Sequence, residues 1–264
     1  MTLRESRSAA QLRPAVGSAR SWVRFLAGFT VLCGVLLGTS AADATGRWGL
    51  AILAAVLLTA VAVEMLQHKT SAADGLRRLG LGRPGGRAIV VAAAVSGVVL
   101  LVFPLTFAVS GAAVQLRPDW LWLLLGIFAF HGLAEELVWR GFAFRRLREG
   151  RSFWSATWWT MPLIAVSHLP IMFTMGPVIG IGALAVAAVT SMPLAYLYET
   201  GRGTIWAPAM VHTAIDSFKL VVIPVAALST FSLLIILVSL TVPLLVLAVP
   251  RRVLTADAPT ARDL

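Results

Sequence analysis

The chain has 264 residues, of which 58% are hydrophobic and only 13% charged, and its formal net charge is +10. Soluble domains usually carry about 25% charged residues. Because several apolar runs approach the length of a bilayer span, the sequence predicts an all-α polytopic membrane protein and excludes disordered and disulfide-stabilised classes. The basic residues gather in the loops between apolar runs, so we expect no nucleic-acid partner.

In chain order, residues 1–20 are expected to be a disordered cytoplasmic tail, residues 21–250 a single transmembrane helical domain, and residues 251–264 a polar C-terminal tail. We predict about eight transmembrane helices, with a polar site within the helix bundle. Their expected ranges are Trp22–Thr39, Trp48–Met65, Ala88–Val109, Trp120–Phe142, Phe153–Phe173, Pro177–Tyr198, Thr204–Leu220 and Ile223–Val249.

The distribution of basic residues predicts the orientation of these helices. All but three of the 22 Lys and Arg residues fall in or beside the tails and the alternate loops assigned to the cytoplasm; the exceptions are Arg47, Arg117 and Lys219. By the positive-inside rule, this asymmetry favours both termini in the cytoplasm. We therefore expect a multi-pass protein of the cell (inner or plasma) membrane, with the lipid bilayer as its surroundings.

The fourth predicted span contains two adjacent carboxylates and an arginine. A charge near the centre of a bilayer costs at least about 2.5–3.5 kcal/mol, so such residues persist by pairing or by facing a polar cavity. Glu136 and Arg140 are four residues apart and can pair on one helix face. Glu135 points about 100° away from Glu136 and is free for another task. His131 lies one turn before Glu135, on the same face.

Two further spans offer groups of the same kind. His168 lies late in the fifth span, and His212 and Asp216 lie four residues apart on one face of the seventh. Each could be a hydrogen-bonded packing residue or a local ion pair. Because intramembrane ionisable groups tend to converge on one interior, their presence on three separate helices predicts one shared polar site.

These residue types allow two kinds of chemistry. A carboxylate can act as general base on water for amide hydrolysis, while imidazoles orient that water or stabilise a developing oxyanion. Two histidines and a carboxylate are also a zinc-type ligand set. There is no His-Glu-x-x-His motif, and the ligands would come from distant spans. Residue spacing alone does not separate the two possibilities.

The pattern resembles the CPBP family of intramembrane glutamic endopeptidases, also called the CAAX protease or Abi family, which includes relatives of the Rce1-type prenyl-protein proteases. The resemblance covers about residues 120–220. The second of the three family motifs is partial, because Ile164 stands where the family usually has Phe. The motifs correspond, in chain order, to Glu135-Glu136-x-x-x-Arg140, His168 and His212-x-x-x-Asp216.

The resemblance implies a role for each residue. Glu135 would be the catalytic glutamate that activates water, with His168 assisting, and His212 and Asp216 would line the oxyanion side of the site. Relatives in the prenyl-protease branch have Asn at the position of Asp216, and Asp216 could donate a hydrogen bond only if protonated. His131 has no role in the family pattern. The structural partners that fix the helix would be Glu136 and Arg140.

The resemblance further implies an endopeptidase that hydrolyses a peptide bond in a membrane-associated or lipidated peptide or protein, with no metal and no cofactor. An alternative is a non-catalytic membrane protein that uses the same polar cluster for binding, immunity or scaffolding. A proton-coupled transporter is disfavoured, because the sequence has no internal repeat.

Overall fold

The computed structural model describes residues 16–43 and 45–255, and within them the chain is an all-α polytopic membrane protein. Most of the two predicted tails, residues 1–15 and 256–264, lies outside the described residues. The elements, in chain order, are α1 (Ala19–Ser40), α2 (Gly49–His68), α3 (Ala72–Arg78), α4 (Gly86–Leu100), α5 (Val102–Ser110), β1 (Gln115–Leu116), α6 (Trp120–Ile127), η1 (Phe128–Ala134), η2 (Leu137–Phe144), α7 (Arg145–Arg148), α8 (Phe153–Ser167), α9 (Leu169–Met175), α10 (Pro177–Thr200), α11 (Trp206–Ile215), η3 (Asp216–Leu220), β2 (Val221–Val222), η4 (Val225–Ala227), α12 (Leu228–Thr241), η5 (Val242–Ala248) and α13 (Arg251–Thr255).

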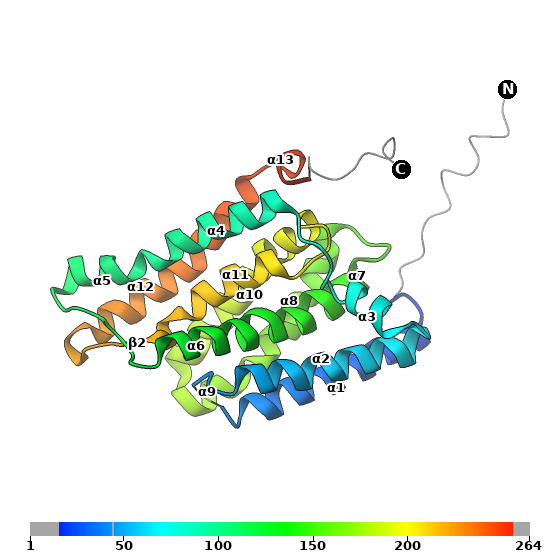
Figure 1. Ribbon diagram of the computed structural model, residues 1–264, viewed down its shortest axis with the longest axis horizontal. Helices are drawn as coiled ribbons and strands as arrows, with labels where there is room; N and C mark the ends of the chain where they lie inside the picture. Colours follow the sequence, from blue (N-terminus) through cyan, green and yellow to red (C-terminus); the bar gives the residue numbers. More distant parts are fainter. Residues whose placement is uncertain (1–15, 44, 256–264) are drawn as a thin grey trace.

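The helices form a bundle of roughly parallel rods (Figure 1). The helices α1 and α2 lie along one side, α4, α5 and α12 along the opposite side, and α10 and α11 between them. The segment from α6 to α7 is central, because η1 packs against both α2 and α11, and α11 packs in turn on α4. The only strands in the described part of the chain, β1 and β2, make one short antiparallel ribbon.

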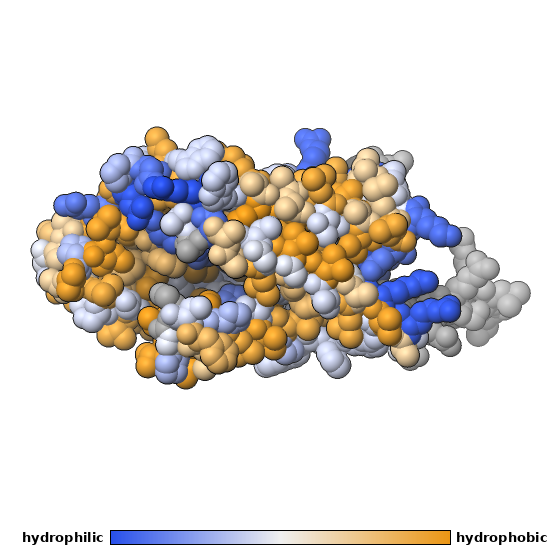
Figure 2. Space-filling view, turned by 90° about the horizontal axis from the view of Figure 1, so that it is seen from below, coloured by the Kyte–Doolittle hydropathy of each residue, from blue (hydrophilic) through white to orange (hydrophobic). Residues whose placement is uncertain are grey.

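Six helical segments of the described chain are long and apolar enough to cross a membrane, whereas we predicted about eight. Their outer flank is apolar, as Figure 2 shows, with hydrophilic side chains gathered toward the ends of the molecule. The six segments span residues 19–40, 49–68, 86–110, 120–148, 177–200 and 225–248.

The other two predicted spans are present as shorter, broken helices, so the count of eight is not confirmed. The fifth is divided at His168, where α8 ends and α9 begins with Pro170 in its first turn. Because proline lacks an N–H and fixes its own φ, it starts a helix more readily than it continues one. The seventh is the short helix α11, which tightens into the 3-10 turn η3 at Asp216.

Two predicted boundaries also differ from the structure. The first helix begins at Ala19 instead of Trp22, because Ser18 and Ser21 form a reciprocal capping box at its N-terminus. The fourth continues past Phe142 to Arg148. Its basic end stays helical because Arg145 and Arg148 pair with Glu64 and Glu199 of neighbouring helices. Glu135 therefore lies about midway along this helix.

Candidate functional site

The helical segment of residues 120–148, from α6 to α7, which we call the central helix, changes its hydrogen bonding around Glu135 and Glu136. The N–H of Glu135 donates to the carbonyl oxygen of Phe130, five residues back. In the same way, the N–H of Arg145 donates to the carbonyl oxygen of Arg140. The wide π-type turns η1 and η2 thus flank Glu135 and Glu136 on both sides. Such turns are rare and occur frequently at functional sites.

A close helix contact brings His212 up to the glutamates. At Gly132, an added Cβ would lie 2.6 Å from Thr213 Oγ1 and 3.2 Å from the carbonyl oxygen of Ala209, both on α11. Only glycine leaves room for the two helices to approach this closely. Because Thr213 is adjacent to His212, this contact sets the distance between the imidazole and the carboxylates of the central helix.

Glu136, Arg140 and His212 form a hydrogen-bonded group in which Glu136 and Arg140 are buried and His212 is 16% exposed. Arg140 Nη1 donates to Glu136 Oε1 at 2.8 Å, and His212 Nδ1 lies 2.7 Å from the same oxygen. Because a carboxylate oxygen paired with a guanidinium is an acceptor, the hydrogen of His212 belongs on Nδ1. The other oxygen, Glu136 Oε2, is buried with no hydrogen-bond partner among the described residues. The predicted Glu136–Arg140 pair is therefore formed.

His212 also faces Glu135 with its opposite edge. Its Nε2 lies 3.6 Å from Glu135 Oε2 and 3.5 Å from Asp216 Oδ2. The sequence predicted that the two glutamates point in different directions, and both nevertheless contact this one ring, because an imidazole presents its two nitrogens on different edges. Glu135 itself is largely enclosed, with 12% of its side chain exposed.

The remaining oxygen of Glu135 is occupied by His131. The His131 Nδ1 atom lies 2.7 Å from Glu135 Oε1. The same nitrogen is 4.0 Å from Asp216 Oδ2, and Lys219 Nζ contacts Nε2 on the other edge of the ring. Lys219 also lies 3.9 Å from Asp216 Oδ1. We call the set of His131, Glu135, Glu136, Arg140, His212, Asp216 and Lys219 the Glu135 cluster.

His168 stands apart from the Glu135 cluster. Its Nδ1 lies 2.9 Å from the carbonyl oxygen of Ile164, so that nitrogen donates and Nε2 is left as an acceptor in the neutral ring. Ser167 Oγ lies 3.1 Å from Nδ1. Neither of these contacts reaches a member of the Glu135 cluster.

Sequence reasoning missed one member of the cluster and assigned no role to another. Lys219 was interpreted only as a loop charge on the non-cytoplasmic side, and His131 only as a neighbour of Glu135. A signal for Lys219 was available, because it follows Asp216 by three residues in an otherwise apolar stretch. In the described part of the chain, no group of three or more His, Cys, Asp or Glu residues is arranged to hold a metal ion.

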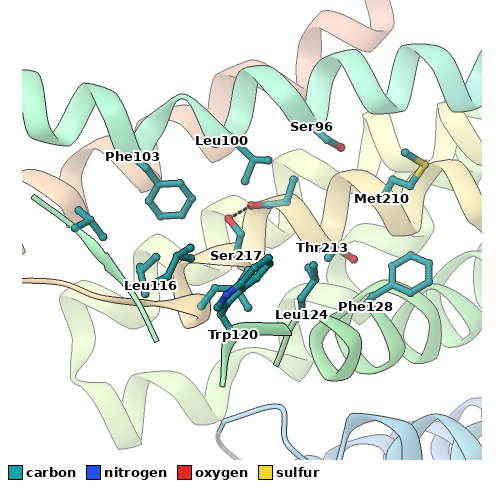
Figure 3. A pocket seen from close by; sticks show the side chains of 14 residues that line it. Ser96, Leu100, Phe103, Leu116, Trp120, Leu124, Phe128, Met210, Thr213 and Ser217 are labelled. Atoms are coloured by element: carbon teal, nitrogen blue, oxygen red, sulfur yellow. Dashed lines mark hydrogen bonds between the residues drawn. The ribbon is translucent and has the colours of Figure 1, made fainter. Parts of the chain in front are cut away.

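An apolar cavity of about 570 Å³ is lined by residues of α4, α5, α6, η1 and the segment from α11 to η3. Figure 3 shows Leu100 and Phe103 on one side of it, Trp120 on the other, and Thr213 and Ser217 between them. The residues that follow His212 and Asp216 in the sequence thus line this cavity, while His212 and Asp216 themselves face the Glu135 cluster. The segment from α11 to η3 thus contributes residues both to an apolar cavity and to the polar Glu135 cluster.

Comparison with known proteins confirms the predicted family over the central part of the chain. Residues 117–218 match the family model described as type II CAAX prenyl endopeptidase Rce1-like. This segment is similar to the Rce1-like family, and it contains all of the residues in the Glu135 cluster except Lys219, which follows directly after it. No curated protein and no solved structure matches the chain.

Proposed function

We propose that the protein is an intramembrane endopeptidase in which the Glu135 carboxylate activates water to hydrolyse a peptide bond. One observation carries the proposal: Glu135 lies enclosed at the middle of a membrane-spanning helix, between two imidazoles, in a segment that matches the Rce1-like model. Its substrate class is a membrane-associated or lipidated peptide or protein, in keeping with the description of that family.

In this mechanism Glu135 takes a proton from water while the water oxygen attacks the carbonyl carbon. His168, through its acceptor nitrogen Nε2, orients the water. The oxyanion that forms is held by His212 when Nε2 also carries a proton, while Nδ1 remains bonded to Glu136. The C–N bond then breaks, and the leaving nitrogen takes the proton from Glu135, which returns the carboxylate to its starting state.

Asp216 receives a modified role in this proposal. Its oxygens face His212 Nε2 and Lys219 Nζ, which are both donors when protonated. The side chain is thus placed as an acceptor that orients its neighbours, whereas an asparagine at this position could donate to an oxyanion directly. Glu136 and Arg140 would fix the helix and the tautomer of His212.

The membrane orientation is also a proposal. The helices α3, α7 and α13 carry clusters of basic residues and lie at the same end of the bundle (Figure 1). Under the positive-inside rule this end faces the cytoplasm of the cell membrane, which places both termini there. Reporter fusions at each terminus would test it, and a periplasmic or external signal from either one would contradict it.

The test of activity uses purified protein in lipid nanodiscs and an internally quenched peptide that ends in a farnesylated Cys-aliphatic-aliphatic-X sequence. We expect the wild type to cleave it and Glu135→Gln to lose at least about 1,000-fold in kcat while its unfolding midpoint is unchanged. Glu149→Gln is the matched control, since this glutamate pairs with Arg145 at the helix end and is half exposed. Full cleavage by Glu135→Gln would rule out the mechanism.

A complementary experiment needs no assumed substrate. Membrane peptide fragments are compared between cells with the wild type and cells with Glu135→Gln, and fragments present only with the wild type identify the substrate. A partner that co-purifies equally with both, without any difference in fragments, would favour the non-catalytic binding or scaffold function. Chelator treatment and elemental analysis in the same preparation test whether cleavage requires a metal.

A further inference from the structure

His131 is held between two charged groups. On one edge of its ring, Nδ1 lies 2.7 Å from Glu135 Oε1, and on the other edge Nε2 contacts Lys219 Nζ. The ring also stacks on Phe130, with centroids 4.0 Å apart. The side chains of His131 and Glu135 are only 11% and 12% exposed. The imidazole therefore has little freedom to rotate.

The chemistry of Lys219 fixes the direction of these hydrogen bonds. An ammonium group has three donors and no acceptor, so Nε2 of His131 must accept. In the neutral ring the hydrogen then lies on Nδ1, where it can donate only toward Glu135. The chain of bonds thus has one polarity, from Lys219 through His131 to the carboxylate. Lys219 is itself costly at this depth unless it is paired.

We propose that Lys219 and His131 are a positioning pair for Glu135. His131 holds one carboxylate oxygen and aims the other toward the reacting water, and Lys219, which needs an acceptor at Nε2, keeps the ring in the neutral form with its hydrogen on Nδ1. The inference rests on the proposed function, because it concerns how the water-activating group is oriented. It also explains why a histidine outside the family motifs lies one turn before the motif glutamate.

The tautomer can be measured without any substrate. The chain has four histidines, so protein labelled with ¹⁵N-histidine gives four rings, and the signal of His131 is assigned by its loss in His131→Asn. We expect a neutral His131 with the hydrogen on Nδ1 in the wild type. Lys219→Met should shift the ring away from this form, and Lys69→Met, at an exposed loop lysine, should not. A hydrogen on Nε2 in the wild type, or no response to Lys219→Met, would overturn the proposal.

Kinetics with the farnesylated peptide test the positioning role. His131→Leu should lower kcat about 10- to 100-fold at unchanged KM, since a small misplacement of a reacting group costs this much. His131→Asn, whose amide can still donate to Glu135, should recover most of the rate. The double variant His131→Leu/Lys219→Met should be no slower than His131→Leu alone, because both changes break one chain of bonds. Additive losses, or a change in KM alone, would contradict the positioning pair.

The two proposals fail in different ways. If Glu135→Gln retains cleavage, the proposed function is wrong, and the ¹⁵N spectra still decide whether Lys219 sets the tautomer of His131. If Glu135→Gln is inactive but His131→Leu keeps the wild-type kcat, only the positioning role is wrong.

Discussion

Two buried glutamates in neighbouring membrane-spanning segments have opposite surroundings. Glu64 on α2 is fully buried, and among the described residues its hydrogen bonds come only from arginines: Arg145 Nη2 at 2.6 Å, Arg146 Nη2 at 2.8 Å and Arg78 Nε at 3.1 Å. His68 Nε2 lies farther away, 3.9 Å from Glu64 Oε2. Because guanidinium groups keep their protons in proteins, the hydrogen-bonded partners of Glu64 cannot exchange one with a substrate. Glu64 is thus equipped to hold three helices together.

Glu135 is surrounded instead by imidazoles, side chains that can both donate and accept a proton. Its two oxygens face His131 Nδ1 and His212 Nε2. The arginine of this site, Arg140, is bonded to Glu136. The comparison teaches that burial of a carboxylate does not by itself identify a catalytic site. The kind of side chain that contacts the carboxylate distinguishes a structural ion-pair cluster from a reactive site.

Among the variants that test this comparison, we expect the largest loss of activity for a substitution of His212. We predict that His212→Ala lowers kcat by about 100- to 10,000-fold, the range for loss of an acid–base or oxyanion group, while the protein still folds. Folding is retained because Glu136 keeps its bond to Arg140. Cleavage kinetics and the unfolding midpoint in detergent measure the two effects. Activity within threefold of the wild type would remove His212 from the mechanism.

Glu64 should show the reverse pattern. In the Glu64→Ala variant, Arg145 and Arg146 are left as buried charges without their carboxylate, and breaking such a cluster costs about 3–5 kcal/mol of folding free energy. The activity of the molecules that remain folded should equal that of the wild type. The midpoint of unfolding and the rate per folded molecule are the measurements. A stable but inactive Glu64→Ala protein would break the distinction between the two glutamates.

The approach of α11 to the central helix is tested at Gly132. A methyl group here would lie 2.6 Å from Thr213 Oγ1, so α11 must move outward and take His212 away from Glu135. We predict that Gly132→Ala reduces kcat by about 10- to 100-fold, with a smaller effect on stability. Gly97→Ala is the matched control, because an added Cβ there meets nothing within 4 Å. Equal rates in both variants would show that this contact does not set the site.

The sequence predicted the convergence of the site better than the ends of its helices or its outer partners. Glu135, Glu136, His212 and Asp216 meet as expected, since charged groups in spans have few other stable positions. The end of the fourth helix was predicted too early, at Phe142, because its extension to Arg148 depends on Arg145 pairing with α2, a contact between segments distant in sequence. Such pairing leaves no local pattern in the sequence.

The same limit explains why the number of spans was not confirmed and why Lys219 was missed. A hydropathy pattern registers apolar length but not the break at His168, where α8 ends and α9 begins with Pro170 in its first turn. The position of Lys219 follows from the 3-10 turn η3, which carries its side chain back toward His131. Neither the break nor the turn follows from residue periodicity alone.

A third buried carboxylate, Asp43, gives the smallest predicted effect and tests whether backbone partners behave like those of Glu64. Asp43 lies in the loop before α2, 6% exposed, and accepts hydrogen bonds from the N–H groups of Thr45, Gly46 and Trp48 and from the Thr45 hydroxyl. Burial raises the pKa of the Asp43 carboxyl, but these hydrogen bonds outweigh burial and hold its pKa below the usual value. The contribution is therefore structural, and it depends on the charged form.

We predict that Asp43→Ala lowers the free energy of unfolding by about 1–2 kcal/mol, as for the loss of a helix-capping side chain, with no change in kcat. The sign of the pH dependence follows from the lowered pKa. Above the unfolded pKa of about 3.9 the stabilisation is fully present, and it is lost as the pH falls through the lower, folded value. The difference in unfolding midpoint between wild type and Asp43→Ala should therefore be constant from pH 7 to about pH 5 and shrink below about pH 4. A difference that grows on acidification would mean that Asp43 is stabilised in its neutral form, and its partners would then resemble neither those of Glu64 nor those of Glu135.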